Sequence, residues 1–131
     1  MEILTKLVQP LIILIGIIHL GFALGEIFFT TAMLEKLFGY TDEFTEKTAP
    51  IAKNAGIYNS FIAVGLFWSA FAVDNTFRLR LFFLICVAIA GIFGAMTLPN
   101  KDNPTKKNFK TFYLQTIPAI IAILLIWKTV Y

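Results

Sequence analysis

The sequence predicts an all-α integral membrane protein: a bundle of four membrane-spanning helices in one domain over residues 1–131, with an amphipathic extension before the second span. Two observations predict this class. Hydrophobic residues make up 58% of the chain and charged residues only 15%, whereas a soluble domain carries about 25% charged residues. The mean hydropathy is +0.78, and a chain this short has too little volume to bury so much apolar surface in a soluble core. We therefore expect lipid to cover much of the protein.

Four stretches are mostly apolar over about 20 residues, the length that crosses the hydrocarbon of a bilayer. They are residues 7–30, 52–73, 79–98 and 109–130. We expect helices, because a helix satisfies its own backbone groups in lipid and the continuous runs are too long for barrel strands. Ala23 and Gly25 loosely fit a signal-peptide cleavage site, but the long first run and His19 within it favour a retained span.

The connection between the first and second spans carries helix-end signals. Thr41 precedes two acidic residues, as an N-cap does, and Gly39 just before it is typical of a helix C-cap. A helix is therefore expected to begin near Asp42, outside the membrane. Its first part is amphipathic, and Pro50 is expected to bend it before it enters the bilayer.

Basic residues favour one orientation in the membrane. The connections after the first and third spans carry seven lysines, against four basic residues on the other side. The positive-inside rule therefore predicts a multi-pass protein of the cell membrane with both termini outside. The net charge is +3, but the basic residues lie in short connections and not on one face with interleaved aromatic rings, so we expect no nucleic-acid partner.

Polar residues inside the first span lie on one face of the helix. At seven-residue spacing this face consists of Gln9, Ile12, Gly16, His19, Ala23 and Glu26. His19 and Glu26 are two turns, about 10 Å, apart, so a group from another helix is expected between them. A carboxylate in hydrocarbon is costly, and Glu26 should face the bundle, pair or be protonated. Alternatively, Glu26 reaches the headgroups and His19 only joins helices.

The second span carries polar groups on two faces. Asn54 and Tyr58 share one face, and Asn59 lies about 100° around the helix from Tyr58. Gly56 belongs to a row of small residues that allows a neighbouring helix to approach closely. We expect the amide and phenol groups to meet Glu26 and His19 across the bundle. The alternative is that they only hold helices together.

The last two spans differ in character. The third contains no ionisable group and many small residues, which predicts a packing helix. In the fourth, Gln115 lies one turn before Pro118. We expect Thr111, Gln115 and Pro118 to form a polar notch; the alternative is that Pro118 causes only a tolerated kink in the helix. The candidates for ligand binding or proton coupling are therefore His19, Glu26, Asn54, Tyr58, Asn59 and Gln115. With one histidine and one cysteine, we expect no metal site, and no cofactor motif is present.

Five motifs in order resemble a known family. They are "IHLGFALGEIFF", "FGYTDEF", "AKNAGIYNSFIAVGLFW", "AGIFGA" and "LQTIPAIIAIL". Together they cover nearly the whole chain and resemble the small bacterial membrane proteins catalogued as domain of unknown function 1304. Ala55 stands where that family typically has glutamine. The resemblance implies a four-helix membrane fold and no established activity.

Three functions fit these residues. The first is a protein that binds or transports a small amphipathic or cationic molecule with proton coupling. The protein's size resembles that of the small multidrug resistance transporters. With this function we expect it to form a homo-oligomer. The second is a structural or accessory membrane subunit without a ligand. The third is a membrane enzyme acting on a lipid-like substrate, with His19 or Glu26 as general acid/base; the absence of a nucleophile or metal motif makes it less favoured. The bilayer is a partner in all three.

Overall fold

The computed structural model of the protein describes residues 2–99 and 107–130, and these are almost entirely helical. The long helices are α1 (Glu2–Phe28), α3 (Asp42–Phe71), α4 (Thr76–Thr97) and α5 (Ile117–Val130). Shorter elements join them: α2 (Thr30–Ala32) and two π-helical segments, η1 (Met33–Phe38) and η2 (Phe112–Thr116). The β-pairing among these residues is a single bridge between Pro99 and Lys107. Residues 100–106, which make up most of the lysine-bearing connection after the predicted third span, lie outside the described residues.

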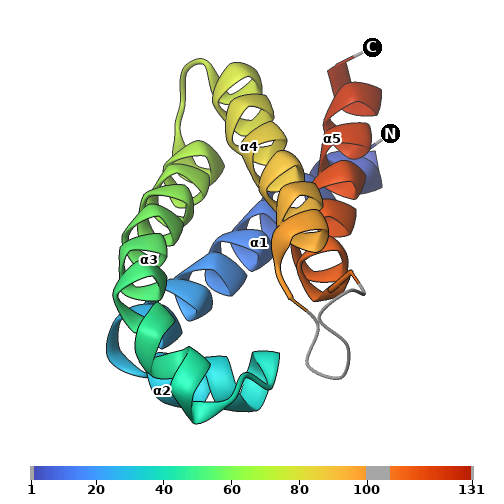
Figure 1. Ribbon diagram of the computed structural model, residues 1–131. Helices are drawn as coiled ribbons and strands as arrows, with labels where there is room; N and C mark the ends of the chain where they lie inside the picture. The colour runs from blue at the N-terminus through green and yellow to red at the C-terminus, as the bar shows by residue number, and fades with distance from the viewer. Residues whose placement is uncertain (1, 100–106, 131) are drawn as a thin grey trace.

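The long helices run back and forth between two ends of the molecule. The start of α1, the end of α5 and the link between α3 and α4 lie at one end, and α2, η1, the end of α4 and η2 lie at the other (Figure 1). α1 packs along α3 and also contacts α5, while α4 packs against α3, η2 and α5.

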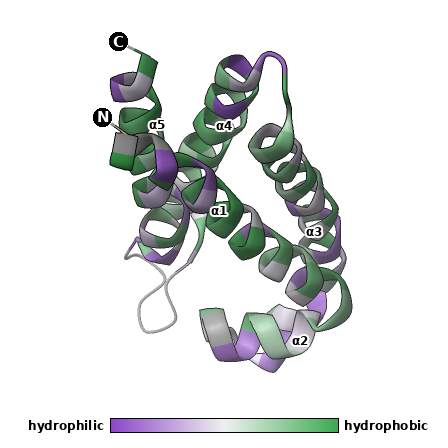
Figure 2. Ribbon diagram, turned by 180° about the vertical axis from the view of Figure 1, so that it is seen from behind, coloured by the Kyte–Doolittle hydropathy of each residue, from purple (hydrophilic) through white to green (hydrophobic). Residues whose placement is uncertain are grey.

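Three helical segments are long and apolar enough to cross a membrane: Lys6–Phe28, Thr76–Thr97 and Phe112–Val130. They contain most of the predicted first, third and fourth spans. α3, which contains the predicted second span, is less apolar because it begins with a polar extension and carries Asn54 and Asn59. Figure 2 shows hydrophobic residues along α1, α4 and α5, and hydrophilic residues gathered near the two ends. These features identify a membrane protein.

Lipid is the expected solvent for the outer surface of these helices. Large apolar side chains are exposed along all the long helices, among them Leu14, Ile17, Phe82, Phe93 and Leu124. A soluble monomer rarely exposes apolar patches of more than a few hundred Å². The inward faces carry Ile12, Ile15, Leu66, Leu84 and Ala119, which are fully or almost fully buried and belong to one core.

The start of α3 has the predicted caps. Gly39 adopts a left-handed conformation with φ 71° and ends η1. The Thr41 hydroxyl then accepts a hydrogen bond of 3.4 Å from the backbone N–H of Phe44. Asp42 begins the helix, which continues through Pro50 to Phe71 without interruption. The predictions of a C-cap at Gly39 and an N-cap at Thr41 are therefore confirmed.

Two polar side chains bind the carboxyl end of α3. Arg80 of α4 donates from Nε to the carbonyl of Ser69 at 3.0 Å, and from Nη2 to the carbonyl of Ala70 at 3.4 Å. Gln9 of α1 donates to the same Ala70 carbonyl at 3.0 Å. The last carbonyls of a helix have no partner within the helix. Here they hold α1, α3 and α4 together.

The small residues of α4 face η2, as expected of a packing helix. The hydroxyl of Thr111 donates to the carbonyl of Gly91 at 3.2 Å, and the hydroxyl of Thr116 donates to the carbonyl of Ala88 at 3.0 Å. A Cβ atom on Gly91 would lie 2.8 Å from the backbone nitrogen of Thr116 and 2.9 Å from the Cβ of Gln115. Only glycine therefore permits this close approach.

Substitution of Gly91 by alanine is expected to lower the free energy of unfolding by about 1–3 kcal/mol, because the added methyl group meets backbone atoms that cannot move aside. Gly21 of α1 is a matched control, since a Cβ there meets nothing within 4 Å. Gly21→Ala should be neutral or stabilise by up to about 1 kcal/mol. Unfolding of the purified variants in detergent micelles measures the free energy of unfolding of each. An equal change for Gly91→Ala and Gly21→Ala would contradict the proposed packing of Gly91.

Candidate functional site

A carboxylate and an amide meet where α1 packs against α3. The Nδ2 of Asn59 donates to the Oε2 of Glu26 at 2.7 Å, and both side chains are partly buried. A hydrogen bond to a charged group is about twice as strong as one between neutral groups. At 2.7 Å this hydrogen bond is shorter than the other one described between the two helices, from Gln9 to the carbonyl of Ala70 at 3.0 Å.

The approach of the two helices at this point depends on Gly56. A Cβ on Gly56 would lie 2.7 Å from the Cγ1 of Ile27 and 3.1 Å from the backbone oxygen of Ala23. The predicted small-residue row thus packs on α1, the same helix that Asn59 reaches. One face of α3 both packs closely and supplies the amide, whereas we had expected two separate faces to do so.

A mostly apolar cavity of about 220 Å³ lies beside Glu26. We call it the Glu26 cavity. Its walls come from α1, η1, the start of α3 and the residues after α4, and include Leu34, Phe38, Ile51 and Leu98. Glu26 is the charged residue among those that line it. A single carboxylate in an apolar cavity is a simple recognition site for a small molecule with one polar group.

Tyr40 places a second polar group on the wall of the Glu26 cavity. Its ring packs against Phe44 and Phe38, with centroids 4.9 and 5.8 Å away. Its hydroxyl is buried and has no hydrogen-bond partner among the described residues. Burial raises the pKa of this hydroxyl above its usual value, so it keeps its proton and can donate. A buried donor without a partner costs about 1–3 kcal/mol.

The π-helical segment η1 shapes this wall. It supplies Leu34 and Phe38, and the backbone N–H of Tyr40 donates to the carbonyl of Leu34 at 3.0 Å. π-Helical turns are rare and often occur at functional sites. Sequence reasoning missed Tyr40 and η1 as site residues. The available signal was the motif "FGYTDEF", which includes Phe38, Tyr40 and Phe44.

The other predicted site residues lie elsewhere. His19 is 1% exposed; its Nδ1 lies 3.0 Å from the carbonyl of Ile15 in the same helix, and its ring packs edge-on against Phe22. Within the described part of the chain, no contact shows a group that bridges His19 and Glu26. Gln115 is buried in η2, against Gly91 of α4.

Of the three residues expected to meet Glu26 from the second span, only Asn59 makes this contact. Asn54 is exposed. Tyr58 is 61% exposed and packs against Phe61, with ring centroids 6.1 Å apart. Neither residue is among those that line the Glu26 cavity. The physical reason is the turn of α3 that Gly56 sets, which directs Asn59 inward and the face with Asn54 and Tyr58 outward.

Comparison with known proteins gives one match. The model of a protein family described as "Protein of unknown function (DUF1304)" matches residues 13–127. The matched range includes Glu26, Tyr40 and Asn59. No curated protein and no solved structure matches the sequence significantly.

Substitution of Asn59 by alanine is expected to lower the free energy of unfolding by about 1–2 kcal/mol, because it leaves the Glu26 carboxylate without its hydrogen bond. Asn54→Ala, on the exposed face of the same helix, is the matched control. It should change the free energy of unfolding by less than about 0.5 kcal/mol. Unfolding in detergent micelles gives both values. A larger loss for Asn54→Ala than for Asn59→Ala would contradict the assigned contact.

Proposed function

The chain belongs to the DUF1304 family of proteins of unknown function, and we propose that it is a four-span membrane protein that binds a small amphipathic, cationic molecule in the Glu26 cavity. The observation that carries this proposal is the position of the Glu26 carboxylate, which lines an otherwise mostly apolar cavity. A cationic head on the ligand would pair with Glu26. An apolar tail would pack against Leu34 and Phe38.

The size of the cavity limits the ligand. Sites for drug-sized molecules usually enclose about 300–1,000 Å³, and the Glu26 cavity is smaller, at about 220 Å³. The ligand class is therefore a small amine with a short apolar chain. The buried Tyr40 hydroxyl is a donor that an acceptor on such a molecule, or a bound water, would satisfy.

The same carboxylate supports coupling to protons. Glu26 can hold either a cation or a proton, so binding of a cation displaces the proton. In this proposal α3 is the second span, and its amide at Asn59 faces α1, away from lipid. Four short helices enclose little volume, so transport across the membrane would use a homo-oligomer. Proton coupling and transport would therefore both depend on binding of the cation at Glu26.

A structural role is the second candidate, and a specific contact favours it. The hydrogen bond of 2.7 Å from Asn59 to Glu26 joins α1 to α3, and polar groups in membrane proteins often serve only to join helices. In that case Glu26 would contribute to stability and no ligand would prefer its cavity. The two candidates differ in what Glu26→Gln does, since glutamine can still accept from Asn59 but carries no charge.

Hexylammonium is expected to bind the purified protein at least about tenfold more tightly than hexanol, because a hydrogen bond to a charged group contributes about 1.5–3 kcal/mol. Glu26→Gln should remove this preference while the protein stays folded. Lowering the pH should weaken binding of the cation, since protonated Glu26 has no charge. Calorimetric titration measures all three effects.

Glu46→Gln is the control, since Glu46 is exposed on α3 and does not line the Glu26 cavity. It should bind hexylammonium as the unmodified protein does. Equal affinity of the unmodified protein and Glu26→Gln for hexylammonium at every pH would contradict the proposed function and favour the structural role.

A further inference from the structure

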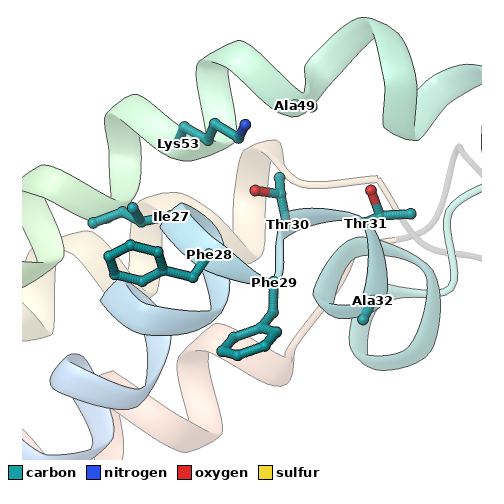
Figure 3. A pocket seen from close by; sticks show the side chains of 8 residues that line it. All are labelled: Ile27, Phe28, Phe29, Thr30, Thr31, Ala32, Ala49 and Lys53. Carbon is teal, nitrogen blue, oxygen red and sulfur yellow. The ribbon is translucent and has the colours of Figure 1, made fainter.

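A second cavity lies at the break between α1 and α2. It measures about 320 Å³ and is lined by Phe28, Phe29, Thr30 and Thr31 from the break and by Lys53 from α3, among others. In Figure 3 the Lys53 side chain extends from α3 above the break, and the rings of Phe28 and Phe29 project away from it. The Glu26 cavity and this one share no lining residue.

Two polar groups of this second cavity are free to bind a ligand. Among the described residues, the Lys53 ammonium and the Thr31 hydroxyl have no hydrogen bond or ion pair. The neighbouring Thr30 hydroxyl, by contrast, already donates to the backbone oxygen of Glu26 at 2.6 Å. A cation and a hydroxyl donor that line the same cavity can both bind the oxygens of a phosphate group.

The position of the cavity along α1 indicates what kind of phosphate it would meet. The apolar segment of α1 ends at Phe28, so we expect the hydrocarbon to give way to the headgroup region at this residue. Phe28 and Phe29 are 69% and 66% exposed, so their rings can lie against acyl chains. Aromatic rings at the level of the headgroups commonly anchor a protein at the interface.

We propose that this second cavity binds the phosphate group of an anionic membrane phospholipid. Lys53 contributes the charge, Thr31 donates a hydrogen bond, and Phe28 and Phe29 contact the upper part of the acyl chains. Lys36 of η1 lies in an element at the same end of the molecule (Figure 1) and adds to the attraction for an anionic leaflet. The site is separate from the Glu26 cavity and does not depend on its ligand.

Native mass spectrometry of the full chain, released from detergent with equal amounts of phosphatidylglycerol and diacylglycerol, tests this proposal. Both lipids carry the same acyl chains, and only the first has a phosphate. We expect the protein to retain phosphatidylglycerol in preference to diacylglycerol. Lys53→Gln should lower the retention of phosphatidylglycerol about fivefold, because one lysine near an anionic surface contributes about 1 kcal/mol. Lys53→Arg keeps the charge and should retain the lipid.

Lys47→Gln is the matched control, because Lys47 is exposed on the same helix and pairs with Glu43 at 2.6 Å. It should retain phosphatidylglycerol as the unmodified protein does. Equal retention by the unmodified protein and Lys53→Gln overturns the proposal, as does equal retention of the two lipids. An excess of inorganic phosphate should not displace the lipid, and full displacement would assign the site to free phosphate and overturn the lipid as its ligand.

Discussion

The need of each polar group for a partner inside the protein governs how these helices pack. Lipid offers no hydrogen bonds, so an unpaired polar group in the hydrocarbon costs several kcal/mol. The described contacts follow this constraint: Thr116 reaches a carbonyl of α4, and Arg80 and Gln9 reach carbonyls at the end of α3. Asn59 meets Glu26 for the same reason. Apolar surface is left to face lipid.

The two cavities show where this constraint is relaxed. Both lie near the end of the molecule formed by α2, η1 and the start of α3 (Figure 1), and both include residues from the last turn of the apolar segment of α1. There the buried Tyr40 hydroxyl and the Lys53 ammonium have no protein partner among the described residues. The buried hydroxyl of Thr45, at the start of α3, is also without a partner among the described residues. Buried polar groups usually have a hydrogen-bond partner, so these hydroxyls favour partners from outside the chain.

Local signals in the sequence were sufficient to predict most of the helices and the ends of one of them. Gly39 has the left-handed conformation that a C-cap needs, and Thr41 caps α3, because capping depends only on residues close in the chain. The apolar runs predicted four spans, and three helical segments of the structure are long and apolar enough to cross a membrane. The small residues of α4 predicted its packing role, since Gly91 lies against η2.

For the candidate site, the sequence by itself determined that Glu26 shares one polar face of the first apolar helix with His19 and that amides follow in the second. It did not determine which amide meets Glu26, because helical spacing relates residues within one helix and not between two. Tertiary packing decided that: the contact of Gly56 with α1 turns Asn59 inward and leaves Tyr58 exposed. The position of Tyr40 at the cavity also depended on tertiary structure, because the cavity walls come from η1, α3 and α1, which are separate in the sequence and packed together in the fold.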